Sequence, residues 1–220
     1  MTQPFRLALQ LATPFAVDHP LTLDGLLSAA VFRATGKRGR ETIPEIPLVR
    51  ELDVFHGSSL HYSKRYAHEP VHRVMSLRHR RDLSPELFSP NRKRGNGYLA
   101  VDQQRGAYKA NLSSYAGIAA DEVFFWGLGD GEACVHLIAT YLLGIGKRAN
   151  AGAGQIYGVH LEASNDHSWI APSGRPARPL PVELWREIGA VDMEVAPMTV
   201  DVPYWSGAQV AAVFPTTPVV

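Results

Sequence analysis

The chain of 220 residues carries 22 Lys and Arg against 21 Asp and Glu, and 45% of its residues are hydrophobic, which allows a packed core and excludes wholesale disorder. Its single cysteine, Cys134, cannot form an internal disulfide or a cysteine-rich zinc site, which excludes a disulfide-stapled secreted module. No stretch reaches the roughly 20 apolar residues that span a bilayer, and Arg6 and Gln10 interrupt the N-terminus as no signal peptide does, so we expect a cytoplasmic protein.

Two amphipathic elements open the chain. Residues 5–12 alternate between apolar and more polar positions, which predicts a half-buried strand. Leucine and alanine then recur at helical spacing over about residues 23–34. Thr22 is a suitable N-cap and Gly36 a suitable C-terminal stop, so we expect a helix between them.

The middle of the chain predicts strands. Candidate strands cover residues 50–55, 57–63 and 71–77, and residues 107–115 alternate in hydropathy again. The apolar run from Glu122 to Leu128 contains three aromatic residues and predicts a buried strand.

A second helix and a last strand complete the predicted core. Asp130 is a suitable cap for a helix that runs to about Leu143, and residues 155–163 alternate as a strand does. The order strand, helix, strands, helix, strand predicts an α+β fold with a ferredoxin-like (RNA-recognition-motif-like) split β-α-β core.

The remaining sequence adds an insertion and an extension to this core. We assign residues 1–165 to one domain, with a basic hairpin or loop inserted at about 64–109. Residues 166–220 are expected to form an irregular C-terminal extension that packs on the same domain. Within it, residues 182–188 predict a short helix, and the last 25 residues predict a tail with one apolar strand.

The basic residues gather in the insertion. Residues 64–109 contain 11 Lys and Arg against 4 Asp and Glu, whereas the rest of the chain contains 11 against 17. Clustered like charges repel unless a polyanion neutralises them, which favours a nucleic-acid contact over a merely solvated loop. Tyr98 and Tyr108 either stack on unpaired bases or belong to the core. The candidate RNA-binding residues of the insertion are Arg78, Arg80, Arg81, Arg92, Lys93, Arg94 and Lys109.

A glycine-rich loop follows the second predicted helix. It lacks the glycine that a Walker A motif needs before Gly146 and Lys147, and its spacing and its place before a strand exclude the dinucleotide fingerprint. A bare main chain beside two cations suits a phosphodiester backbone. A plain helix cap would use one glycine and would leave Gly152 and Gly154 unexplained. The candidate RNA-binding residues of the loop are Gly144, Gly146, Lys147, Arg148, Asn150, Gly152 and Gly154.

These features resemble the RAMP superfamily of CRISPR-associated RNA-binding proteins over about residues 1–165. The resemblance rests on the glycine-rich loop before the last core strand and on an N-terminal pattern. That pattern reads Thr13-Pro14, His19-Pro20-Leu21 and Leu23-Asp24-Gly25-Leu26-Leu27. It is most similar to the small subunit of type IV CRISPR effector complexes, which caps the 5′ handle of the crRNA.

The resemblance implies a binding protein without cofactor or metal rather than an enzyme. Its expected partners are the crRNA, whose 5′ handle it would hold, the repeating backbone subunit and the large subunit; target DNA is a further candidate, and no membrane contact is expected. Residues 64–109 would correspond to the thumb-like hairpin that folds over the guide in such proteins, matched by position and charge only.

Two alternatives stay open. The first is a RAMP-type endoribonuclease that matures the crRNA without metal, because some relatives use His, Tyr or Lys as general acid and base. The candidate catalytic sets would be His56, His61, Tyr62 and Lys64, or His68 and His72. Binding of one metal ion by His68 and His72 would need a helix, and Pro70 between them argues against one. Asp130 and Glu132 are better explained as residues at the start of a helix than as a catalytic carboxylate pair. The second alternative is a ferredoxin-fold assembly protein whose basic loop binds an acidic protein partner.

Overall fold

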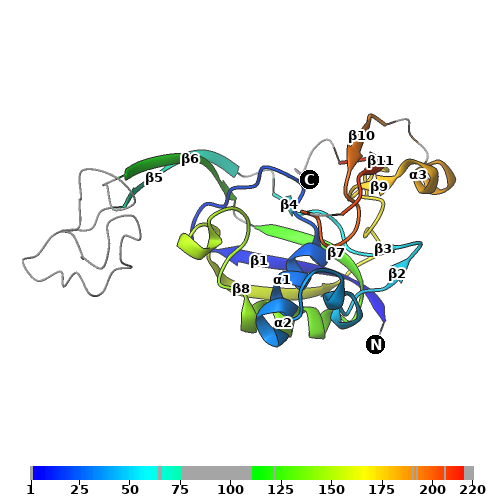
Figure 1. Cartoon of the computed structure of the whole chain (residues 1–220), viewed down its shortest axis with the longest axis horizontal. Helices are drawn as coiled ribbons and strands as arrows, with labels where there is room; N and C mark the ends of the chain where they lie inside the picture. The colour runs from blue at the N-terminus through cyan, green and yellow to red at the C-terminus, as the bar shows by residue number, and fades with distance from the viewer. Residues whose placement is uncertain are drawn as a thin grey trace, which may run out of the picture. The chain divides into compact units, whose positions relative to one another are not determined.

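The computed structural model of the chain describes residues 2–63, 66–75, 111–120, 122–189, 191, 193–205 and 207–215. The chain divides into two compact units, one of Met1–Glu69 with Gly117–Val220 and one of Pro70–Ala116. The first unit holds the main sheet and its helices (Figure 1). The seven basic candidates of the insertion lie outside the described residues.

A four-stranded antiparallel sheet forms the centre of the first unit. Its strands lie side by side in the order β4, β7, β1, β8. They cover Gln3–Leu11 (β1), His61–Tyr62 (β4), Val123–Gly129 (β7) and Ile156–Ala163 (β8). The helices between them are α1 (Leu23–Thr35), the 3-10 helix η1 (Gly39–Glu45) and α2 (Gly131–Tyr141). The protein is therefore α+β. Along the chain, α1 follows β1 and α2 follows β7.

Local signals set the ends of the two long helices. The Thr22 hydroxyl accepts a hydrogen bond from the Gly25 amide at 3.3 Å, and Gly36 ends α1 with φ of 80°. Asp130 caps α2 by accepting from the Ala133 amide at 3.1 Å. These caps confirm the sequence prediction, because capping depends on residues within one turn. None of the helices in the described part of the chain is long and apolar enough to cross a membrane.

The main core lies between the sheet and the two helices, which pack against each other on one face (Figure 1). Alternate residues of β1 and β7 point into it, and the apolar stripe of each helix meets them. Burial raises the pKa of Cys134 to about 12, so this thiol stays protonated. The buried members from these elements are Phe5, Leu7, Leu9, Leu23, Leu26, Leu27, Ala30, Val123, Phe125, Cys134 and Ile138.

The chain itself covers aromatic side chains on the other face of the sheet. Phe124 and Trp126 of β7 point to this face, and each is only 5% exposed. Ala171 and Ala177 pack with them in a second buried cluster. The ring of His167 also approaches Trp126, with centroids 5.5 Å apart. The segment that follows β8 therefore shields these aromatic rings from solvent.

The C-terminal extension is more regular than expected. It contains the predicted helix, α3 (Val182–Ile188), and a three-stranded sheet of order β10, β11, β9. The strands cover Leu180–Pro181 (β9), Val195–Met198 (β10) and Val210–Val213 (β11). The prediction of an irregular extension ending in a tail with one strand is wrong, because strands of two to four residues are too short to show a period in the sequence.

The predicted strands of the middle segment are shorter than expected. The strand predicted over 50–55 is a hairpin of β2 (Arg50–Glu51) and β3 (Val54–Phe55). Within the range 57–63 the structure has only β4, which pairs with β7 at the edge of the main sheet. In both ranges, turns and isolated bridges take the place of part of the predicted strand, and an alternation pattern does not reveal them.

A separate two-stranded sheet pairs β5 (Tyr66–Met75) with β6 (Asn111–Ala120). The sequence predicts these strands at 71–77 and 107–115, so both exist but are displaced along the chain. Element boundaries are the least certain part of a pattern-based prediction, since alternation continues into flanking residues.

A buried ion pair fastens the extension to the first helix. Arg178 and Asp24 both have side chains that are 0% exposed, and Arg178 Nη1 donates to Asp24 Oδ1 at 3.1 Å. The Tyr204 hydroxyl accepts from Arg178 Nη2 at 2.7 Å and donates to Asp24 Oδ2 at 2.6 Å. The guanidinium also donates to four backbone oxygens, those of Phe55, Gly57, Val200 and, from Nε at 3.4 Å, Pro179. One side chain thus joins α1, the residues around β3 and the C-terminal segment.

Candidate nucleic-acid interface

The glycine-rich loop lies against the turn that follows β1. A short 3-10 helix, η4 (Ala149–Ala151), occupies the middle of the loop. The Gly154 amide donates to Pro14 O at 2.9 Å, and the Lys147 amide donates to Ala16 O at 2.7 Å. The loop and the start of the N-terminal pattern, which carry the family resemblance, are therefore in direct contact.

Thr13 ties the two segments together through its side chain. Its hydroxyl donates to Gly152 O at 2.7 Å and accepts from the Gln155 amide at 3.0 Å. Thr13 belongs to the N-terminal pattern, but nothing in the sequence indicates this role. Its partner Gly152 is 139 positions away, and a contact over that separation leaves no local signal in one sequence.

Packing within the protein accounts for three of the four glycines of the loop. A Cβ on Gly144, Gly146 or Gly154 would lie between 2.4 and 2.9 Å from a backbone oxygen, closer than any side chain tolerates. Gly152 ends η4 with φ of 91° and has open space where its Cβ would be. Gly154 is therefore explained by the fold, and Gly152 is the glycine that leaves bare main chain at the surface.

We expect Gly146→Ala to lower the free energy of unfolding by about 3 kcal/mol, because its Cβ would meet Ala16 O at 2.4 Å and its φ is 74°. The matched control is Gly152→Ala, which has only the left-handed backbone penalty of about 1 kcal/mol. Urea unfolding followed by tryptophan fluorescence measures both. Equal losses in the two variants would contradict the packing role of Gly146.

Two adjacent cations stand in this loop. Lys147 Nζ makes an ion pair with Asp18 Oδ2 at 2.5 Å, and the two side chains are 54% and 59% exposed. The hydrogen bond and charge of Lys147 hold the pKa of Asp18 below its ordinary value, so the carboxylate stays ionised. Arg148 has φ of 63°, a left-handed conformation that a residue with a Cβ rarely adopts. Asn150 follows on the surface.

A hollow of about 280 Å³ opens beside this ion pair. Asp18 and His19 contribute polar groups to its wall, and Val17, Leu21 and Ile118 contribute apolar surface. The hollow therefore combines an apolar lining with a neighbouring pair of cations.

The helix-free face of the main sheet is a poorer candidate for binding RNA. Sheets that read single-stranded RNA stack bases on exposed aromatic side chains, and Phe124 and Trp126 are buried here. The Arg6 guanidinium lies 4.1 Å over the Phe124 ring and forms ion pairs with Glu122 and Glu162. Both the aromatic rings and the cation of this face are thus already engaged within the protein.

The structure separates the described members of the first catalytic set. His61 lies among aromatic rings, with its centroid 4.6 Å from that of Trp126, whereas its neighbour Tyr62 packs into the main core. His56 is buried elsewhere and stacks on Trp169, with centroids 4.0 Å apart. These three side chains therefore do not converge on one reacting group.

His56 lies near a serine and two carboxylates, but their hydrogen bonds are not those of a nucleophilic triad. Ser168 Oγ lies 3.0 Å from His56 Nδ1 and donates to Asp166 Oδ1 at 2.6 Å. In a triad the histidine takes the serine proton and donates to a carboxylate, whereas here the buried serine donates to Asp166, and Glu51 Oε2 lies 3.6 Å from His56 Nε2, beyond hydrogen-bond distance. Desolvation lowers the pKa of His56. The arrangement links the segment after β8 to the β3 region.

The second set, His68 and His72, lies on the extended strand β5, where both side chains are exposed. Within the described ranges, no group of three or more His, Cys, Asp or Glu side chains is arranged to hold a metal ion. Lys64, Tyr98 and Tyr108 lie outside the described residues.

Acid should destabilise the protein through His61. Burial lowers the pKa of this histidine from 6.5 to about 4, so as the pH falls the unfolded chain binds the proton first. Its contribution to stability is complete above pH 6.5 and is lost toward pH 4, which amounts to about 2 kcal/mol between pH 7 and pH 5. Urea unfolding of the parent protein at pH 7 and at pH 5 should show this decrease in the free energy of unfolding. The variant His61→Phe should lack the part of the decrease that His61 contributes. An identical pH dependence in the variant would contradict the assignment.

Comparison with known proteins adds one result. A family model described as CRISPR type IV associated protein Csf3 matches residues 3–215. The match includes both segments of the loop interface, the basic insertion and nearly all of the C-terminal extension, so it goes beyond the range of the resemblance noted from the sequence. No curated protein sequence matches the chain.

Proposed function

The chain belongs to the Csf3 family of type IV CRISPR-associated proteins, and from this we propose that it is a non-catalytic RNA-binding subunit of a type IV effector ribonucleoprotein. In this role it holds the 5′ handle of the crRNA in the cytoplasm. It acts beside the repeating backbone subunit and the large subunit, and it assists recognition of the target nucleic acid.

The order of strands in the main sheet supports this proposal. The units β1-α1-β4 and β7-α2-β8 interleave, so that β7 lies between β4 and β1. This order fits the split β-α-β arrangement of the ferredoxin-like, RNA-recognition folds that the RAMP superfamily uses.

The observation that carries the proposal is the pair of cations on the loop that packs against the β1 turn. Lys147 and Arg148 are adjacent, and backbone hydrogen bonds hold their loop in place. Phosphate contacts by such cations supply affinity that does not depend on sequence. The hollow beside Asp18 suits an unpaired base while the cations neutralise the neighbouring phosphates. The basic insertion at 64–109 would add further phosphate contacts.

Removal of both loop cations tests the proposal. We expect Lys147→Ala/Arg148→Ala to weaken binding of labelled repeat RNA by about 20-fold at 0.1 M salt and to reduce the log–log salt slope by about 1.4, if each cation contacts one phosphate. Fluorescence anisotropy over a salt series measures both. Asp18→Asn is the matched control, because it releases Lys147 from its ion pair and should strengthen binding. An unchanged slope in the double variant would remove the loop from the interface.

The same RNA separates the proposal from its alternatives. Tight, salt-sensitive binding without cleavage supports a binding subunit. Cleavage in the presence of EDTA would instead identify a metal-independent endoribonuclease. Absence of RNA affinity would favour an assembly protein that binds an acidic protein partner.

A further inference from the structure

A strained turn presents one leucine at the tip of the β2–β3 hairpin. Two residues, Leu52 and Asp53, join the strands, and their φ values are 47° and 63°. A two-residue hairpin turn with positive φ at both positions is the type I′ geometry that Asn-Gly satisfies best. A leucine is unfavourable there because its Cβ crowds the backbone in the left-handed region.

The leucine gains little from the described part of the protein in return. Its side chain is 72% exposed. The hairpin is anchored instead by Val54 and Phe55, each 1% exposed, and by an ion pair between Arg50 and Asp53 at 3.0 Å. Leu52 is thus an apolar tip on a well-anchored support.

Carboxylates surround this tip. The side chains of Glu51 and Asp53 are 61% and 83% exposed on either side of Leu52. Asp53 is paired with Arg50, so Glu51 supplies the negative charge that repels the phosphates of a nucleic acid. An apolar protein pocket with a rim of Lys or Arg is complementary to a leucine between two carboxylates.

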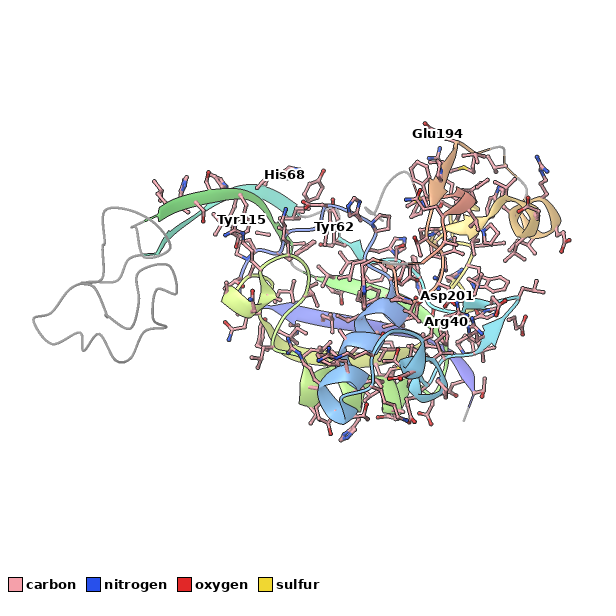
Figure 2. All side chains as sticks on the ribbon, viewed as in Figure 1. Arg40, Tyr62, His68, Tyr115, Glu194 and Asp201 are labelled. Atoms are coloured by element: carbon pink, nitrogen blue, oxygen red, sulfur yellow. The ribbon has the colours of Figure 1, made fainter. Side chains whose placement is uncertain are left out.

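A hollow of about 350 Å³ opens beside the leucine, with Arg40, Asp201 and Val210 in its wall. Arg40 and Asp201 lie next to each other in Figure 2, and their charged groups are 3.8 Å apart. A partner that binds the leucine in a pocket therefore contacts both this protruding side chain and the hollow beside it.

We propose that Leu52 is an anchor residue that inserts into an apolar pocket, rimmed by Lys or Arg, on another protein subunit of the type IV particle. Strained residues persist where the strain serves a function, and here the strain keeps a leucine at a position that Asn or Gly would occupy more favourably. The inference depends on the family and not on RNA binding. It assigns the acidic hairpin to protein contact and leaves RNA to the cationic loop.

The variant Leu52→Asn/Asp53→Gly separates the side chain from the turn. It installs the preferred turn sequence, so the thermal midpoint of the isolated protein should rise by about 3 °C. Its affinity for the particle, reconstituted from purified type IV subunits, should fall at least about tenfold. Assembly is measured with and without crRNA, so failure of RNA binding would not be mistaken for failure of docking. Leu52→Met is the control, since it keeps an apolar side chain of similar volume and should bind within about threefold of the parent.

Any of the following outcomes would overturn the proposal. A stable double variant that assembles like the parent would show that Leu52 is not an anchor. A lowered midpoint would refute the strain. Reduced RNA affinity of the isolated variant would assign the hairpin to RNA, and loss of a dimer in solution would assign it to a second copy of this chain.

Discussion

Replacement of Arg178 by Met should lower the free energy of unfolding by about 4 kcal/mol and the thermal midpoint by about 10 °C. Methionine occupies a similar volume but donates no hydrogen bond. The change would leave the buried Asp24 carboxylate without its counter-ion and would remove the guanidinium donor from the backbone oxygens of Gly57 and Val200, while Phe55 O keeps the Trp169 indole as a donor. Burial also raises the pKa of Tyr204, whose hydroxyl keeps its proton and supplies Asp24 with one remaining hydrogen bond.

Two comparisons make this prediction specific. Arg175→Met changes an exposed arginine three positions earlier and should cost less than about 1 kcal/mol. The double variant Asp24→Asn/Arg178→Met should lose less than the sum of the two single losses, because neither buried charge is then left alone. Chemical unfolding measures all of these variants. A parent-like stability for Arg178→Met would mean that the ion pair is not needed to join the extension to α1.

Neutralisation of the basic insertion should have the largest effect on RNA binding. Six arginines and lysines are changed to Gln together in this variant, namely Arg78, Arg80, Arg81, Arg92, Lys93 and Arg94. If each contacts one phosphate of a single strand, the log–log salt slope falls by about 4 and affinity at 0.1 M salt falls by about 10⁴-fold. Anisotropy with labelled crRNA over a salt series measures both quantities.

The control for this variant removes cations elsewhere. Lys37→Gln/Arg38→Gln/Arg40→Gln changes three exposed cations that follow α1 and should leave the salt slope unchanged. Parallel thermal unfolding tests whether the insertion contributes to the core, and the midpoint of the six-site variant should match that of the parent. Equal slopes for the two variants would show that RNA affinity follows net charge rather than the insertion.

Particular elements show where sequence reasoning succeeded. The caps at Thr22 and Asp130, the stop at Gly36 and the helix at 182–188 all match the structure. Each depends on interactions within a few residues, which a single sequence contains in full. The buried strand of β7 is also confirmed, since six of its seven residues are buried, and its first four, Val123 to Trp126, are all apolar or aromatic.

The glycine-rich loop shows where sequence reasoning was incomplete. The sequence suggests that its glycines make room for a ligand, yet three of them make room for the protein's own backbone. Nothing in the sequence indicates that Asp18 pairs with Lys147 or that Thr13 hydrogen bonds across the loop. A glycine has the same letter whether its missing Cβ admits RNA or another strand, so only the spatial neighbours distinguish the two.

Composition, charge distribution and local patterning determine by themselves that this chain is α+β, that half of its Lys and Arg residues lie within residues 64–109, and where its three α-helices begin. Tertiary structure alone decides that Arg178 meets Asp24, that the aromatic rings of β7 are shielded, and that Leu52 is raised on a strained turn. The difference is physical. Periodicity and capping act over a few residues, whereas burial, counter-ions and the identity of a neighbour depend on segments that only folding brings together.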